Sequence, residues 1–270
     1  MQEYGVGIFD LVFTKSALKK ALKKGLITVN SKPATSATYI YNGDVITFQP
    51  EDKMPQKKQF IQHLNVVFED DYLAVIVKPA GLLVSGNTFK TVANALEQNL
   101  KRSAQTDATK PQPVHRLDYA TTGVLLIGKT KQSIIALNTL FKTKQIVKQY
   151  YAITIGDMPK SGEINTPIDD KKALSVFRVL ATVDSKRFTK LNLVDLSPKT
   201  GRKHQLRKHV FSLGNPILGD RDYFLPRLFL KGKGMYLHAY YLEFIHPFTQ
   251  ENLIIKDELP ERFGKIFSNY

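Results

Sequence analysis

The sequence predicts an α+β protein built around a mixed β-sheet. Apolar runs of β type recur along the 270 residues, a few segments with helical spacing lie between them, and strands and helices do not alternate regularly. Hydrophobic residues make up 43% of the chain, which is enough to bury a sizeable core and excludes a disordered protein.

The first fifty residues predict a small α/β unit. A helix is expected over Lys15 to Lys24, because apolar residues recur there at helical spacing, and Gly25 can end it in a left-handed cap. Residues 26–48 then predict short strands that are joined by turns at 30–32 and 42–44.

This helix is unusually rich in lysine, and its candidate RNA-binding residues are Lys15, Lys19, Lys20, Lys23 and Lys24. Lys19 with Lys23, and Lys20 with Lys24, are like charges one turn apart, and each such pair costs about 0.2–0.5 kcal/mol. A helix that tolerates this repulsion often faces a polyanion, although a solvated lysine face is the alternative.

The segment from Glu51 to Gln59 is charged, contains a proline and has no apolar period. Such a segment is typical of a linker. The chain is therefore expected to consist of a small domain at 1–50, a linker at 51–62 and a large domain at 63–270.

In the large domain, apolar runs predict strands in the order 66–68, 73–77, 124–127, 150–155, 191–196 and 236–245. Helical spacing predicts helices over 91–101 and 132–142. A further helix is expected around Leu206 and Val210, where Gly214 can cap its C-terminus.

The charge balance limits the classes of molecule that this protein is expected to bind. Lysine and arginine number 39 against 24 acidic residues, a formal net charge of +15, which favours nucleic acid or an acidic membrane surface. The absence of cysteine excludes disulfides, thiolate zinc sites and cysteine nucleophiles. No signal peptide is apparent and the apolar runs are too short to span a bilayer, so we expect a cytoplasmic protein without membrane contact.

The tetrapeptide His115-Arg116-Leu117-Asp118 is the first candidate site, since it precedes the predicted strand at 124–127. A carboxylate flanked by arginine and histidine is suited to chemistry on an anionic substrate. An aspartate beside a strand can also be a simple turn residue.

The second candidate site is the run from Thr200 to His209, which follows the predicted strand at 191–196. Lys203 and Arg207 are one helical turn apart, and His204 precedes Arg207 by three residues. A strand that leads into a cationic helix N-terminus forms an anion site, because free N–H groups add to the side-chain charge. The alternative is a basic surface helix.

Three stretches, HRLDYATTG at 115–123, KQYYA at 148–152 and TGRKHQLRKH at 200–209, together resemble the RluA family of RNA pseudouridine synthases. The likeness extends from about residue 64 to the C-terminus and includes GNPILGDRDY at 214–223. It implies the pseudouridine synthase fold, with a mainly antiparallel sheet, and a uridine isomerase that needs no cofactor. The first fifty residues resemble the small S-four-like RNA-binding domain that many members carry.

The resemblance implies roles for individual residues. Asp118 matches the catalytic aspartate, and Arg207 matches the arginine that pairs with the carboxylate. Tyr150 matches the tyrosine that stacks on the target base, for which the resemblance also leaves open a part in proton removal. Arg116 matches the residue that fills the gap left by the flipped nucleotide. The other residues expected to contact RNA are His115, Leu117, Thr121, Arg202, Lys203, His204 and Leu206.

Several alternatives accompany this interpretation. His115 and His204 could suggest a metal pair, but no further ligand lies at a suitable spacing, so no metal site is predicted. Tyr119 and Ala120 replace two charged residues that the family commonly has after the aspartate, which predicts altered RNA contacts. The likeness favours large-subunit ribosomal RNA over transfer RNA as the partner. A non-catalytic RNA-binding or ribosome-assembly protein that retains the fold is the second hypothesis.

Overall fold

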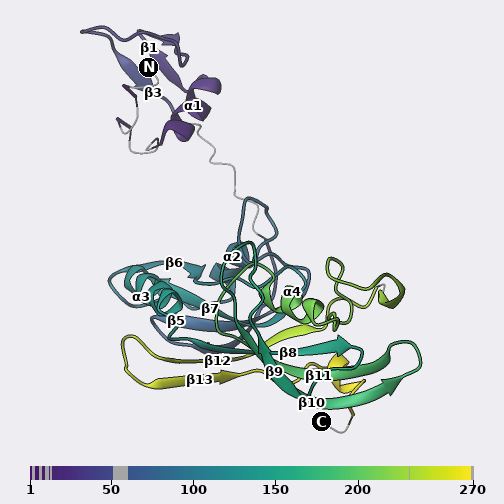
Figure 1. The fold of residues 1–270 in the computed structure, drawn as a ribbon. Helices are drawn as coiled ribbons and strands as arrows, with labels where there is room; N and C mark the ends of the chain where they lie inside the picture. Colours follow the sequence, from purple (N-terminus) through teal and green to yellow (C-terminus); the bar gives the residue numbers. More distant parts are fainter. Residues whose placement is uncertain are drawn as a thin grey trace. The chain divides into compact units, whose positions relative to one another are not determined.

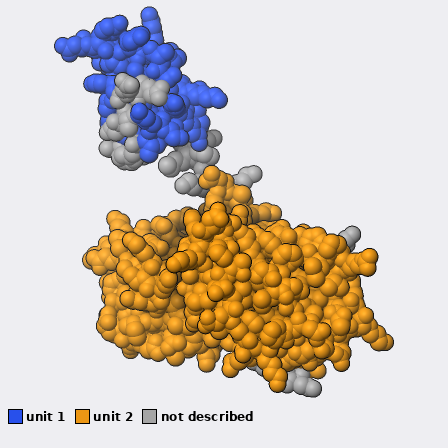
Figure 2. Space-filling model, in the orientation of Figure 1, with its two compact units in different colours: residues 1–58 blue, residues 59–270 orange. Residues whose placement is uncertain are grey.

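The computed structural model describes the chain except for residues 2–3, 6–7, 10–11, 13, 51–59, 231 and 269–270. Figure 1 shows its helices and strands. The chain forms two compact units, residues 1–58 and residues 59–270, which Figure 2 distinguishes by colour. Most of the linker that we predicted at 51–62 lies outside the described residues.

The first unit pairs one helix with a small sheet. Its sheet has the order β2-β1-β3 and is antiparallel, with β1 at Ile27–Val29, β2 at Lys32–Pro33 and β3 at Ile46–Phe48. Helix α1 spans Lys15–Lys23 and packs an apolar stripe into the core of the unit. The helix and the strands predicted for this part of the chain are thereby confirmed.

Both ends of α1 have the local chemistry that a helix terminus needs. The hydroxyl of Thr14 accepts a hydrogen bond from the Ala17 N–H, which satisfies one free donor of the first turn. Gly25 follows the helix with φ of +69°, a left-handed conformation that glycine adopts without strain. The five lysines identified in the sequence are all exposed on or beside this helix.

The second unit contains, among its described residues, a ten-stranded sheet. Eight of its strands follow the order β4-β5-β7-β12-β8-β11-β10-β9, and β6 and β13 complete the ten by pairing with β7 and β12. Its strands are β4 (Asn65–Glu69), β5 (Leu73–Lys78), β6 (Ala108–Pro113), β7 (Thr122–Thr130), β8 (Val147–Ile155), β9 (Ser161–Ile164), β10 (Ser175–Ser185), β11 (Thr189–Pro198), β12 (Leu237–Ile245) and β13 (Asn252–Lys256). Of the described strand pairs, only β7 with β12 is parallel. The mixed, mainly antiparallel α+β architecture is as predicted.

Few helices accompany the sheet, and in Figure 1 α2, α3 and α4 are drawn above the long strands. They are α2 (Val92–Ala95), which continues as the 3-10 turn η1 (Leu96–Gln98), α3 (Lys131–Lys142), α4 (Gln205–Ser212), η2 (Pro226–Leu228) and α5 (Glu261–Gly264). The helix predicted over 91–101 is therefore shorter than expected, because its second half tightens into a 3-10 turn and ends at Gln98. No described helix is long and apolar enough to cross a membrane.

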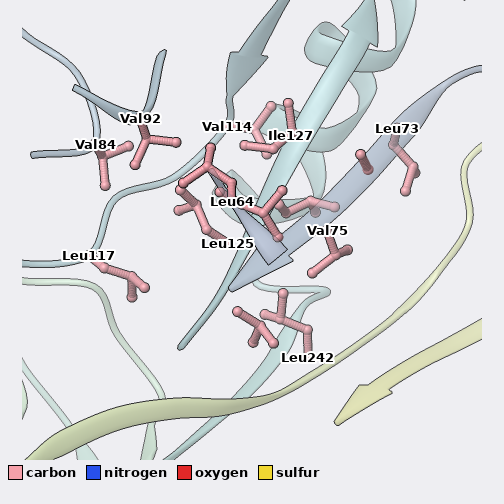
Figure 3. Close-up of a cluster of buried hydrophobic side chains, with 14 of the residues drawn as sticks. Leu64, Leu73, Val75, Val84, Val92, Val114, Leu117, Leu125, Ile127 and Leu242 are labelled. Carbon is pink, nitrogen blue, oxygen red and sulfur yellow. The ribbon is translucent and has the colours of Figure 1, made fainter. Parts of the chain in front are cut away.

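The central strands β5 and β7 are buried almost throughout, and they form the heart of the largest hydrophobic cluster (Figure 3). Leu117, which lies outside any strand, belongs to this cluster and is 5% exposed. It anchors the segment before β7 to the core. That segment carries Asp118, so burial of one leucine fixes the position of the neighbouring carboxylate.

The parallel contact of β7 with β12 depends on a glycine. Gly123 has φ of +114°, and a Cβ atom there would lie 2.0 Å from the carbonyl oxygen of Ala239. Only glycine permits this approach. The contact joins the half of the sheet that carries Asp118 to the half that carries Tyr150.

Candidate active site

A cleft of about 940 Å³ in the second unit collects the predicted site residues from three separate stretches of the chain. Its walls include every candidate that the sequence placed in the large domain: His115, Arg116, Leu117, Asp118, Thr121, Tyr150, Arg202, Lys203, His204, Leu206 and Arg207. The lysines of α1 belong to the first unit and are not among the residues that line the cleft.

Asp118 lies in the turn between β6 and β7. Its backbone carbonyl accepts a hydrogen bond from the Thr121 N–H at 3.1 Å, and its side chain is 22% exposed at the cleft wall. The next carbonyl, that of Tyr119, accepts from the Gly81 N–H at 2.8 Å and from the Lys78 ammonium at 3.3 Å. Backbone contacts therefore hold the carboxylate in place while its side chain stays accessible.

Arg207 reaches Asp118 from the first turn of α4 and is 6% exposed. Its Nη1 donates to Asp118 Oδ2 at 3.2 Å. The opposite edge of the guanidinium donates through Nε and Nη2 to the two oxygens of Asp220, each at 2.6 Å. Nη2 also donates to Asp222 at 2.7 Å. One guanidinium thus connects three carboxylates.

Asp220 determines where this guanidinium lies. It is 1% exposed, and its Oδ1 also accepts from the backbone N–H groups of Asp222 and Tyr223. Burial opposes the charge of Arg207, but its hydrogen bonds with Asp220 hold the pKa of the guanidinium above its usual range. The arginine is a permanent cation in this cleft.

His204 lies on the other side of Asp118, with Nε2 at 3.8 Å from Oδ1. Its Nδ1 is 3.2 Å from the hydroxyl of Tyr223. Burial lowers the pKa of His204, although the charge of Asp118 acts in the opposite direction. Oδ1 of Asp118 therefore accepts no hydrogen bond within the described residues, whereas Oδ2 accepts one from Arg207.

The start of α4 differs from the expected helix in one respect. The helix begins at Gln205, and His204 has a left-handed φ of 55°, so Lys203 is not on the helix and is not one helical turn from Arg207. Gln205 is buried, and its amide oxygen accepts from the Thr200 hydroxyl at 2.6 Å and from the Arg202 N–H at 3.0 Å. Lys203 reaches the cleft as part of this ordered turn.

Tyr150 lies on β8 and is half-buried between two core clusters. Burial raises the pKa of its phenol well above the usual range, and the charge of Asp118 adds to the effect. Tyr151, its neighbour, stacks on Tyr240 with ring centroids 3.7 Å apart and does not line the cleft. Alternation along the strand therefore leaves Tyr150 as the cleft tyrosine.

A second group in the cleft consists of His115, Phe141 and Lys148, which we call the lysine subsite. The His115 and Phe141 rings have centroids 4.7 Å apart, and Lys148 Nζ is 5.7 Å from the centroid of the Phe141 ring. Lys142 and Lys144 also line the cleft. From this set the sequence had given His115 as a candidate RNA contact and Lys148 only as the first residue of the KQYYA stretch.

Sequence reasoning also missed Lys78 and Asp220, which hold the backbone next to Asp118 and its partner Arg207 in place. Lys78, to which the sequence assigned no role, is fully buried and donates to the carbonyls of Pro79, Leu82 and Tyr119. Burial lowers the pKa of Lys78 to about 8, while the charge of Asp118 opposes that shift. Asp220 lies in the GDRDY stretch that contributed to the resemblance, but spacing along the chain could not show that it binds Arg207.

Comparison with known proteins identifies this arrangement. A family model described as RNA pseudouridylate synthase matches residues 72–212, just over half of the chain. The chain belongs to this family. The resemblance to the RluA family is thereby confirmed, and the protein is an RNA pseudouridine synthase, an isomerase.

Individual relatives of this family are similar in sequence over most of the chain. An uncharacterized RNA pseudouridine synthase of Aquifex aeolicus is 34% identical over 95% of this chain and 89% of its own length. The ribosomal large subunit pseudouridine synthase C of Rickettsia conorii is 34% identical, covering 84% of this chain and 83% of the relative. The ribosomal large subunit pseudouridine synthase D of Nitrosomonas europaea is 30% identical, and the match covers 92% of this chain and 78% of the relative.

A solved structure supports the fold. Human RNA pseudouridylate synthase domain containing 4 superimposes with a TM-score of 0.60 at 30% sequence identity, covering 74% of this chain and 90% of the human chain. Since the sheet and the cleft both lie in residues 59–270, this unit carries the synthase fold.

Proposed function

We propose that this RNA pseudouridine synthase converts specific uridines of large-subunit ribosomal RNA to pseudouridine, with Asp118 as the nucleophile. The ion pair of Asp118 Oδ2 with Arg207 Nη1, 3.2 Å long and inside the cleft, is the observation that carries the proposal. The names of the Rickettsia and Nitrosomonas relatives support ribosomal RNA over transfer RNA.

The carboxylate is suited to this role. A nucleophilic aspartate must stay ionised in a partly dry cleft, and an adjacent guanidinium favours the charged form. Arg207 engages Oδ2, so Oδ1 faces the substrate with only His204 at 3.8 Å. In the reaction Asp118 bonds transiently to the ribose or to the base, the bond from uracil N1 to the ribose breaks and the base turns. A bond then forms from C5 to the same ribose carbon, and the bond to Asp118 breaks again. C5 loses a proton and N1 gains one, so the net change is an isomerisation and no cofactor is needed.

Tyr150 supplies the stacking surface for the extracted base. Removing a uridine from its stack costs a few kcal/mol, which aromatic stacking partly offsets. The raised pKa keeps the phenol protonated at neutral pH. We therefore assign Tyr150 to holding the base.

Asp220 acts as a positioning residue in this proposal. It does not line the cleft, but it holds the guanidinium on the edge opposite Asp118. Because the bonds to Asp220 are shorter than the bond to Asp118, Arg207 is fixed by Asp220 first and presents Nη1 to the nucleophile.

The remaining candidates bind RNA. Arg116 is exposed at the cleft and forms no ion pair within the described part of the chain, so its guanidinium is available to fill the gap in the base stack. The other contacts come from residues that line the cleft: His115, Leu117, Thr121, Arg202, Lys203, His204 and Leu206. We assign the first unit, with Lys15, Lys19, Lys20, Lys23 and Lys24, to RNA binding as an S-four-like domain. Action on ribosomal RNA also agrees with the cytoplasmic location predicted above.

The proposal is tested by mapping pseudouridine in ribosomal and transfer RNA from a strain that lacks the gene, after incubation with purified protein. Wild type should form pseudouridine in large-subunit ribosomal RNA, and Asp118→Asn and Asp118→Ala should form none while binding the same RNA. Modification confined to transfer RNA would overturn the target. An active Asp118→Ala would overturn the nucleophile.

The lysines of α1 favour a second hypothesis, in which RNA binding alone sustains ribosome assembly. Complementation of a growth defect separates the two. Full rescue by Asp118→Asn, with no rescue by a variant in which the five lysines on or beside α1 are replaced by glutamine, would favour assembly over catalysis. Failure of Asp118→Asn to rescue would favour catalysis.

A further inference from the structure

The ammonium of Lys148 has no oxygen partner within the described residues. Five described lysines are not exposed. Lys129 and Lys78 donate to carboxylate or backbone oxygens. Lys190 pairs with Asp157 and Lys208 pairs with Asp169. Lys148 alone in this set contacts only an aromatic ring, that of Phe141.

A half-buried ammonium without a counter-ion is costly, and proteins seldom retain one. Burial lowers the pKa of Lys148, which is the expected sign of that cost. The Phe141 face attracts the cation but does not neutralise it. Within the described residues the charge therefore has no protein counter-ion, and an anion that enters the cleft can reach it.

His115 adds a fixed hydrogen-bond donor beside this cation. Its Nε2 lies 3.0 Å from the backbone N–H of Leu126, and because that N–H can only donate, Nε2 must be unprotonated. Burial and the neighbouring Lys148 charge lower the pKa of His115 to about 3, so the ring is neutral and its proton is on Nδ1. Within the described residues Nδ1 makes no hydrogen bond, and it is not among the fully buried atoms that lack a partner.

The position of Lys148 on β8 relates these two donors, Lys148 Nζ and His115 Nδ1, to Tyr150, on which the target base is proposed to stack. Lys148 and Tyr150 are two residues apart on one strand, so their side chains project from the same face and both line the cleft. Two residues of strand span about 6.6 Å. This is comparable with the length of one extended nucleotide.

We propose that Lys148 and His115 form a phosphate subsite that binds an RNA phosphodiester next to the target uridine. Phosphate oxygens accept from Lys148 Nζ and from His115 Nδ1, while the Phe141 ring holds the lysine stem and the imidazole in place. The identity of the neighbouring nucleotide as the target uridine rests on the proposed function. The subsite itself rests on the unpaired lysine and the fixed imidazole.

Salt dependence of RNA binding tests the subsite without requiring catalysis. Loss of one phosphate contact reduces the slope of log affinity against log salt by about 0.7–0.9. We expect this reduction, and about tenfold weaker binding to a large-subunit ribosomal RNA transcript, for Lys148→Gln. The matched control is Lys265→Gln, which removes one exposed lysine just after α5, outside the cleft, and should behave as wild type. Equal slopes for Lys148→Gln and Lys265→Gln would overturn the proposal.

A chemical probe covers the case in which Lys148→Gln does not fold. Short single-stranded oligoribonucleotides with one central uridine are made with a neutral methylphosphonate on the 5′ or the 3′ side of that uridine. One of the two should weaken binding to the wild type about tenfold, and Lys148→Arg, which keeps the charge, should show the same preference. Wild-type binding that is indifferent to both substitutions would overturn the subsite.

The two proposals can fail separately. A protein that forms no pseudouridine but keeps the lysine-dependent salt slope would refute the proposed function and retain the phosphate subsite. An active enzyme whose RNA binding is unaffected by Lys148→Gln and by both methylphosphonates would refute the subsite alone.

Discussion

Two cations in the same cleft differ in whether carboxylates neutralise them. Around Arg207, three carboxylates share one guanidinium, and the short bonds to Asp220 hold it before any substrate arrives. In the lysine subsite, Lys148 has no carboxylate within the described residues. A group that reacts has to be preorganised by the protein, whereas a group that binds an anion gains by leaving its charge uncompensated.

The largest expected effect comes from Asp220→Asn, which removes the charge that holds Arg207 in place. Removing one partner of a buried ion pair costs about 3–5 kcal/mol, so the free energy of unfolding measured in urea should fall by that order. We also expect kcat for pseudouridine formation to fall by about 100-fold or more, with a smaller change in KM.

The matched control for this prediction is Asp222→Asn. The carboxylate of Asp222 is 59% exposed and bonds the same Nη2, so its loss should cost less than about 1 kcal/mol and leave most of the activity. Equal effects of the two substitutions would show that burial does not distinguish the two partners of Arg207.

The second prediction concerns Lys78, whose ammonium donates to three backbone carbonyls behind Asp118. Methionine has a similar shape but no donor, so Lys78→Met should destabilise the fold by about 1–3 kcal/mol and lower kcat. The control is Lys129→Met, since Lys129 is also buried but pairs with Glu69 outside the cleft. It should lose stability and keep kcat. Loss of stability without loss of kcat in Lys78→Met would contradict a role behind Asp118.

The third prediction uses the neutral imidazole of the lysine subsite. The pKa of His115 is lowered from 6.5 to about 3, so its contribution to stability is complete above pH 6.5 and is lost as pH falls toward 3, because the unfolded chain binds the proton more tightly. Wild type should lose on the order of 1–2 kcal/mol more than His115→Gln in urea unfolding between about pH 7.5 and 4.5. Parallel pH profiles would mean that His115 titrates normally in the fold.

The smallest expected effect is that of Lys144→Gln. Lys144 is exposed and lines the same cleft as Lys148, so its charge is screened by solvent and salt. Binding of the ribosomal RNA transcript should weaken only about twofold. A loss as large as that of Lys148→Gln would indicate that total cleft charge, and not the half-buried ammonium, governs phosphate binding.

Much of the fold could be predicted from local patterns, and the failures have identifiable causes. Strands β5, β7 and β8 were found because buried runs of apolar residues are unambiguous. Strand β6 was not predicted. It contains Pro111 and Pro113, its described pairing is with β7 alone, and an outer strand tolerates proline. Strand β10 was missed because many of its residues are half-exposed and its register shifts between Val179 and Ala181.

The sequence by itself determined the chemical inventory of this protein: its basic charge, the lysine-rich helix, the stretches around Asp118, Tyr150 and Arg207, and the family to which they belong. Local spacing and composition suffice for such features because they are properties of neighbouring residues. Only the tertiary structure decided that Asp220 holds Arg207 and that Lys148 has no described counter-ion. Both depend on which distant side chains the sheet brings together. Burial, and not separation along the sequence, determines how strongly these charges interact.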